Sequence, residues 1–159
     1  MYRWGRLKLR GSSGILKWKP GGHVKLLAGF LAGVLGAIIL MVLLYLMQAT
    51  GLSGPPGFVS ICRAIVGARP PFDHILGAIG FALAGGMWGS IFAALFPNPT
   101  IVKGMAYGVV PTLFLWLVIS PAMGQGFFNG FTAKGICMPL IFNVLIWGGF
   151  IGWYCGRSR

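Results

Sequence analysis

Acidic side chains are almost absent from this 159-residue sequence, which has one aspartate and no glutamate beside 13 lysines and arginines. Charged residues make up only 9% of the chain, hydrophobic residues make up 57%, and the mean hydropathy is +0.83. This composition cannot supply the polar surface of a soluble domain of the same length, so it predicts a membrane protein. One carboxylate also leaves no acidic pair for general acid–base catalysis, and we expect no enzyme and no catalytic residues.

Histidine is scarce as well. His23 precedes the first long apolar run, and His74 opens the second. If that first run crosses a membrane, about 30 Å of hydrocarbon separates the two side chains. They therefore cannot ligate one haem together. A single axial ligand, or an outer site made of His74, Asp73 and Cys62, remains an alternative. We expect no metal site and no cofactor bound by this chain alone.

The three cysteines show no Cys-x-x-Cys spacing. Cys137 and Cys155 fall on one predicted helix about 27 Å apart and cannot form a disulfide. Cys62 and Cys137 are both expected near the outer face, so a disulfide between them stays open beside the alternative of three free thiols.

What the chain has in abundance is uninterrupted apolar sequence. Four runs are long enough to cross a bilayer at about 1.5 Å per residue, and none carries a side-chain charge at its centre. The sequence predicts an all-α polytopic membrane protein with spans at about 26–48, 75–96, 101–120 and 136–155. A basic arm, 1–25, precedes this 26–156 domain, and a short basic tail, 157–159, follows it.

The basic residues are distributed unevenly about these spans. Seven of the thirteen precede the first span, and only three fall in the segments between spans 1 and 2 and between spans 3 and 4: Arg63, Arg69 and Lys134. By the positive-inside rule, both termini are expected in the cytoplasm, in a prokaryotic inner membrane. Asp73 is expected to cap the start of span 2 at the outer interface.

Small residues form stripes on the predicted spans, as they do where helices pack closely in lipid. The predicted packing positions are, in chain order, Gly29, Gly33, Gly36, Ala78, Ala82, Gly86, Gly89, Ala93, Gly148 and Gly152. Span 1 is expected to pack against span 2 through these positions.

The connecting segments suggest further local structure. Residues 58–68 are expected to form a short helix lying flat at the outer interface. The four-residue turn Pro97–Thr100 is expected to make spans 2 and 3 antiparallel neighbours, and Pro111 is expected to kink span 3. The two halves have similar layouts, although their residues do not align well enough to indicate a repeat.

Aromatic residues supply the candidate ligand site. Phe127, Phe128 and Phe131 lie in the second outer loop, where they either pack the loop or line a cleft for a quinone, pigment or lipid. With His74 they are the candidate cofactor-binding residues. Asn143, within span 4, is expected to make an interhelical hydrogen bond.

The N-terminal arm interleaves basic side chains with apolar ones. Its candidate docking residues, for anionic lipid or for another membrane subunit, are Arg3, Arg6, Lys8, Arg10, Lys17 and Lys19. Nucleic acid is not expected as a partner, because no nucleic-acid-binding fold accompanies the charge.

Two short motifs carry a resemblance. The opening of span 2, His-Ile-Leu-Gly-Ala-Ile-Gly-Phe-Ala from His74, and the segment Pro-Ala-Met-Gly-Gln-Gly-Phe-Phe from Pro121 resemble those of a group of small uncharacterised four-span prokaryotic membrane proteins. In that group the last span often also begins with histidine, whereas Phe142 and Asn143 occupy the comparable region here. The resemblance implies a four-helix membrane fold and no known activity.

Together these features favour a non-catalytic accessory subunit of a larger membrane complex, respiratory or photosynthetic, docking through glycine-faced helices and the basic arm. One alternative is a small homo-oligomeric transporter or channel, although the spans lack the ionisable residues typical of an ion path. The other alternative is a membrane protein that binds a quinone, pigment or lipid.

Overall fold

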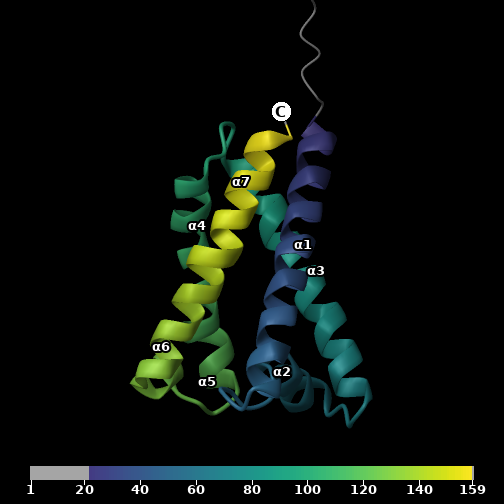
Figure 1. The fold of residues 1–159 in the computed structure, drawn as a ribbon, viewed down its shortest axis with the longest axis vertical. Coiled ribbons are helices and arrows are strands. Elements are labelled where there is room, and N and C mark those ends of the chain that lie inside the picture. Colours follow the sequence, from purple (N-terminus) through teal and green to yellow (C-terminus); the bar gives the residue numbers. More distant parts are fainter. Residues whose placement is uncertain (1–21, 159) are drawn as a thin grey trace, which may run out of the picture.

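The structure, a computed structural model, describes residues 22–158, and every regular element in that range is a helix (Figure 1). The elements are α1 (Gly22–Ala49), α2 (Gly57–Val66), α3 (Phe72–Leu95), α4 (Ile101–Phe114), η1 (Leu115–Ile119), α5 (Ser120–Ala122), η2 (Phe127–Phe131), α6 (Ala133–Pro139), η3 (Leu140–Gly148) and α7 (Gly149–Arg157). Within this range, four helical stretches are long and apolar enough to cross a membrane: Lys25–Ala49, Phe72–Leu95, Ile101–Ala122 and Ala133–Arg157. The prediction of an all-α structure with four helices long and apolar enough to cross a membrane is confirmed for the described residues.

The start of α1 and the end of α7 lie at the same end of the bundle (Figure 1). We call this the terminal end, and the opposite end, where α2 and η2 lie, the loop end. Which side of a membrane the terminal end faces stays a prediction. Helix α1 begins at Gly22, inside the predicted arm; residues 1–21, with all six candidate docking residues of the arm, lie outside the described residues.

Helices α1 and α3 cross at glycine and form the first helix pair. Gly29 and Gly33 on α1 face Gly89 and Gly85 on α3, so that a methyl group built on any of the four would collide with a backbone carbonyl of the other helix. On Gly85, for example, it would lie 2.8 Å from the Gly33 oxygen. Backbone contact this close is what small residues permit in a bilayer, where hydrophobic burial does not drive association.

Of the predicted stripe on span 2, Gly86, Gly89 and Ala93 are buried, whereas Ala78 and Ala82 are only half-buried. Gly85, which the predicted stripe omitted, belongs to the crossing itself. Gly36 faces the ring of Trp147 rather than α3, with 2.7 Å between a built methyl group and Trp147 Cδ1.

The second helix pair consists of α4, η1 and α5 packed against α6, η3 and α7. Here Gly104 faces Gly148 and Gly152, and Gly108 faces the backbone of Asn143 and Val144. A methyl group on Gly148 would lie 2.6 Å from the Gly104 oxygen. Each of the four crossing helices thus presents two glycines spaced four residues apart. The two halves share this packing device.

The two pairs meet through an aromatic layer made of Trp88, Phe92, Phe96, Tyr107 and Trp147, whose rings contact one another. The Tyr107 hydroxyl donates to the Trp88 carbonyl at 3.0 Å, and Trp147 Nε1 donates to the Gly33 carbonyl at 3.2 Å. Helix α1 also packs against α7. These contacts join the pairs over the terminal half of the bundle.

Spans 2 and 3 are antiparallel, but they are not packed along their length as the short turn had suggested. The two spans contact each other mainly through aromatic rings, in the half of the bundle that contains the Pro97–Thr100 turn. The reason is that Gly104 and Gly108 hold α4 backbone to backbone against η3 and α7, so α4 turns away from α3 toward the loop end.

Two prolines lie inside the second pair's helices, and a wider π-helical segment follows each. Pro111 is inside α4, ahead of η1, and Pro139 is the last residue of α6, directly before η3. Proline supplies no backbone donor, and π-helical turns re-pair the neighbouring carbonyls at a different spacing. The effect is to place Asn143 within a widened helical turn.

Candidate functional site

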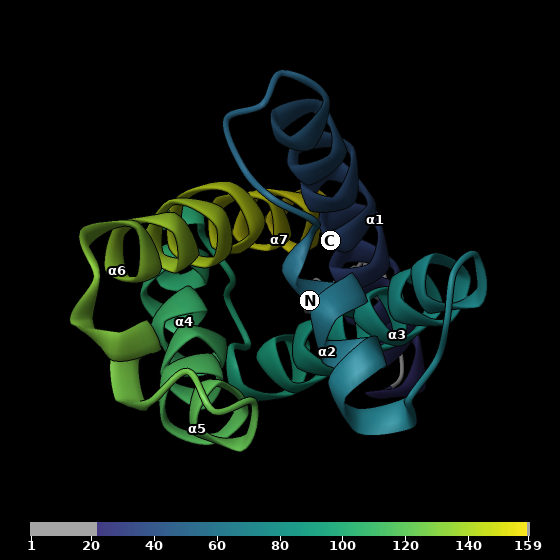
Figure 2. The same ribbon diagram turned by 90° about the horizontal axis from the view of Figure 1, so that it is seen from below.

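A cavity of about 1030 Å³ lies between the two helix pairs, in the half of the bundle toward the loop end. Its walls come from α1, α2 and α3 on one side and from α4, η1, α6 and η3 on the other. In the view from the loop end, the two pairs stand on opposite sides with α2 set against the first (Figure 2). The volume is at the upper end of the range of about 300–1,000 Å³ typical of small-molecule sites. We call this cavity the interpair cleft.

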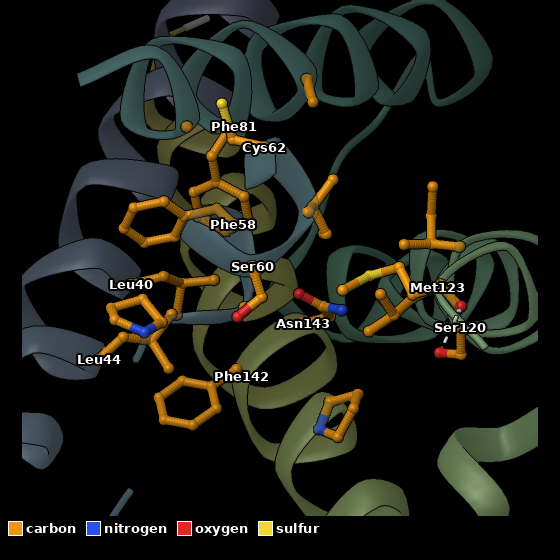
Figure 3. Close-up of a pocket in the computed structure, with 18 of the residues that line it drawn as sticks. Leu40, Leu44, Phe58, Ser60, Cys62, Phe81, Ser120, Met123, Phe142 and Asn143 are labelled. Carbon is orange, nitrogen blue, oxygen red and sulfur yellow. Dashed lines mark hydrogen bonds between the residues drawn. The ribbon is translucent and has the colours of Figure 1, made fainter. Parts of the chain in front are cut away.

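The walls of the interpair cleft are mainly apolar and rich in aromatic rings. They include Leu40, Leu44, Phe58, Phe81, Phe114 and Phe142, several of which Figure 3 shows around the cavity. Trp88 and Trp147, both members of the aromatic layer, close it toward the terminal end. Ile65 and Ile79 also line the cleft and are 66% and 52% exposed.

Polar side chains gather at the loop end of the cleft, contributed by Ser53, Ser120, Gln125, Asn129, Thr132 and Lys134. The Ser120 hydroxyl is hydrogen-bonded to the Asn129 amide oxygen, and Asn129 Nδ2 donates to the Gly135 carbonyl at 3.0 Å. Lys134 Nζ donates to the Leu52 carbonyl at 3.1 Å, which joins the second pair to the loop that leaves α1. Apolar walls with a polar rim suit an amphipathic ligand.

Two further polar side chains lie deeper in the cleft. Ser60 comes from α2 and Asn143 from η3, and Figure 3 shows both extending into the cavity. Neither side chain makes a hydrogen bond to another residue in the described part of the chain. The interhelical hydrogen bond expected of Asn143 is therefore not present in residues 22–158.

Helix α2 forms one wall of the cleft and is fixed to α3. Its Phe58, Val59 and Cys62 side chains are buried, and the Phe58 ring stacks on Phe81 at a centroid distance of 5.4 Å. Gly77 gives room for this packing, because a methyl group there would lie 2.8 Å from the Phe58 carbonyl. The short helix expected at 58–68 is thus present as Gly57–Val66 and packs against α3, and its lying flat at the interface stays a prediction.

An ion pair between Arg63 of α2 and Asp73 of α3 reinforces this contact. Arg63 Nε donates to Asp73 Oδ2, and the backbone N–H of His74 donates to Asp73 Oδ1 at 2.8 Å. Asp73 lies at the N-terminus of span 2, as the sequence suggested. Its partner Arg63 comes from another helix and was not anticipated.

The four residues predicted to bind a cofactor do not line the interpair cleft. His74 pairs through Nδ1 with the Tyr45 hydroxyl at 3.0 Å, and its ring stacks on Tyr45. Phe128 packs on Trp116 and on Phe131, while Phe127 and Phe131 are 58% and 70% exposed. The alternative for these three phenylalanines was that they pack the loop rather than line a ligand cleft. Phe128 packs in this way.

The aromatic residues that do line the cleft were not identified from sequence. Phe58, Phe81 and Phe142 lie on three different helices. No local motif connects them. The one sequence signal near them is the run of small residues Gly77, Gly80 and Ala84, which leaves space beside α3.

All three cysteines are free thiols. Cys62 lines the cleft as a buried free thiol, Cys155 is buried, and Cys137 is exposed. Among residues 22–158, no cluster of three or more histidine, cysteine or acidic side chains could hold a metal ion.

Comparisons of the chain with protein-family models, with curated proteins and with solved structures find no match.

Proposed function

We propose that this protein binds one lipid-class molecule, with its apolar part in the interpair cleft and its polar part toward the loop end. The observation that carries the proposal is the cleft itself, a cavity of about 1030 Å³ with apolar walls, aromatic rings and few polar groups. Sites of this size and lining hold hydrophobic small molecules. This is the binding alternative named from the sequence, with different residues forming the site.

The bilayer setting strengthens the proposal. Helices long and apolar enough to cross a membrane form most of the cleft, and its lining residues Ile65 and Ile79 are largely exposed on α2 and α3. Water gains few hydrogen bonds between such walls, and an empty space forfeits the dispersion contacts of every atom that lines it. A hydrocarbon chain entering from the bilayer restores those contacts. A lipid is therefore the occupant that the surroundings supply.

The proposal is tested by filling the cleft. Gly80 lines it on α3, and a methyl group built there meets no atom within 4 Å. Gly80→Phe should occupy the cleft without displacing the backbone. The matched control is Ala106→Phe, at an exposed position of α4 that does not line the cleft.

Native mass spectrometry of protein extracted in mild detergent gives the readout. We expect the wild type and Ala106→Phe to retain one bound lipid through detergent exchange, and Gly80→Phe to lose it. Equal retention by Gly80→Phe and the wild type would contradict the proposal, as would a wild type that carries no lipid.

The accessory-subunit hypothesis remains a second proposal. The glycine faces of the helices, including Gly33, Gly89 and Gly152, are occupied by packing within this chain, as expected of the packing positions. Docking would therefore depend on the basic arm, which lies outside the described residues. Deleting residues 2–19 tests it, because loss of co-purifying membrane subunits would support docking and unchanged association would contradict it.

A further inference from the structure

We propose that Asn143, assisted by Ser60, binds the carbonyl oxygen of a neutral, flat-ringed ligand of the quinone class within the interpair cleft. This inference rests on the proposed lipid-class function and names the ligand's chemistry. It concerns binding alone.

The first support is the state of the Asn143 amide. The Asn143 backbone carbonyl lies at the crossing with α4, where a methyl group on Gly108 would collide with it. The backbone is thus fixed, while the side chain extends into the cleft without a hydrogen bond to any described residue (Figure 3). An amide among apolar walls costs free energy unless a partner pairs with it. A ligand oxygen would accept from Asn143 Nδ2.

The second support is the absence of charge at this depth. Lys134 is the one charged side chain among the described residues that line the cleft, and it belongs to the loop-end rim. Asn143 follows Lys134 by nine residues, which is about 13 Å along a helix. A phosphate held at Lys134 would leave only acyl chains beside Asn143, and acyl chains offer it no hydrogen bond. The group that pairs with Asn143 is therefore polar and neutral.

The third support is the aromatic surroundings. Phe58 lies two residues before Ser60 on α2, and Phe142 lies directly before Asn143 on η3. Figure 3 shows all four side chains around one space. Aromatic rings favour offset-stacked or edge contacts with another flat ring. A quinone offers such a ring, with carbonyl oxygens at its edge and an apolar tail that the rest of the cleft can hold. A saturated chain with a single hydroxyl could form hydrogen bonds with Asn143 and Ser60, but it would make no ring contacts with Phe58 and Phe142.

Isothermal titration calorimetry in detergent micelles tests the inference with decylubiquinone as the probe. Asn143→Leu keeps the size of the side chain and removes the amide. A neutral hydrogen bond contributes about 0.5–1.5 kcal/mol, so we expect Asn143→Leu to raise the Kd for decylubiquinone about three- to tenfold. Ser60→Ala removes a hydroxyl from another helix and should also raise the Kd for decylubiquinone about three- to tenfold.

Asn98→Leu is the matched control, because Asn98 is an exposed asparagine in the turn before α4, remote from the cleft. It should leave the Kd unchanged, and dioleoylphosphatidylcholine should bind the wild type and Asn143→Leu alike. An unchanged Kd for decylubiquinone in both Asn143→Leu and Ser60→Ala would overturn the inference, as would a wild type that binds phosphatidylcholine but not decylubiquinone. In the latter case, loss of bound lipid in Gly80→Phe would show that the proposed function still holds. If the wild type binds neither molecule, both proposals fail.

Discussion

Arg63 of α2 and Asp73 of α3 form an ion pair in which the aspartate is fully buried and the arginine side chain is 42% exposed. The pair connects the helix that forms one wall of the interpair cleft to the first turn of span 2. Because Asp73 is the only acidic residue of the chain, no other carboxylate can hold Arg63 there. This charge pair therefore adds to the apolar packing of Phe58, Val59 and Cys62 that holds the wall against α3.

Arg63→Ala should destabilise the protein by leaving the Asp73 carboxylate buried without its cation. Because Arg63 is partly exposed and solvent screens the pair, the loss should be smaller than that for breaking a fully buried ion pair. Unfolding by sodium dodecyl sulfate, followed by tryptophan fluorescence, measures the change. Adding Asp73→Asn to Arg63→Ala should restore part of the loss. A loss no larger than that of Arg69→Ala, at an exposed arginine nearby, would contradict this role.

Gly33→Ala should weaken the first helix pair, because its methyl group would collide with the Gly85 carbonyl on α3. Forcing extra volume into a packed contact costs about 1–3 kcal/mol, and here the obstacle is backbone. Gly80→Ala is the matched control on α3, where the methyl group meets open space and helix propensity gains about 0.5–1 kcal/mol. Thermal unfolding in detergent should place Gly33→Ala below the wild type and Gly80→Ala at or above it. The same melting temperature for both variants would refute the packing account.

The second pair allows a parallel comparison. A methyl group on Gly108 would collide with the Asn143 carbonyl, whereas at Gly149 the nearest atom is Met105 Cγ at 3.8 Å, at ordinary contact distance. We expect Gly108→Ala to lower the melting temperature and Gly149→Ala to leave it near that of the wild type. Gly108→Ala should also weaken ligand retention, because it displaces the backbone that carries Asn143. If the two alanine variants behave alike, α4 and η3 do not cross as described.

Lys134→Ala should widen the loop end of the cleft by removing the hydrogen bond to the Leu52 carbonyl. Cys62, which is 7% exposed and lines the cleft, reports this opening through its alkylation by N-ethylmaleimide in a Cys137→Ala background. Loss of a bond of about 1 kcal/mol predicts roughly a fivefold faster reaction. Lys103→Ala is the control, since Lys103 Nζ makes a similar bond of 2.9 Å to the Asn98 carbonyl in the turn between spans 2 and 3. Equal rates in the two lysine variants would show that Lys134 does not restrict the opening.

The spans could be predicted because their signal is local. An apolar run such as 75–96 has to cross the bilayer whatever it packs against, and Thr100 before span 3 is a helix cap whose side chain accepts from the Lys103 N–H. The presence of close-packed glycine faces could also be foreseen. Which glycine of the Gly85–Gly86 pair lies at the crossing depends on the rotation of the helix. That rotation is set by the partner helix and is not visible in a stripe of small residues.

The cleft could not be predicted because it is a space between helices. Phe127, Phe128 and Phe131 lie close together in the sequence and were therefore predicted as cofactor-binding residues. In the structure they lie near the surface at the loop end. Phe58 and Phe142 are far apart in sequence, on α2 and η3, and line one cavity only because the fold brings these two helices to opposite walls of it. The Asn143 side chain likewise makes no interhelical hydrogen bond within residues 22–158 because it extends into that space.

The most direct test of the central claim, that a lipid-class molecule occupies the interpair cleft, is photocrosslinking in vesicles. A phosphatidylcholine with a diazirine in one acyl chain, and a diazirine-tailed ubiquinone analogue, would be activated with the wild-type protein, and the modified residues mapped by mass spectrometry. The account predicts adducts on cleft residues such as Leu40, Phe81 and Phe142, and their loss in Gly80→Phe. Adducts confined to outward-facing residues such as Leu83 and Leu145, unchanged in Gly80→Phe, would contradict it.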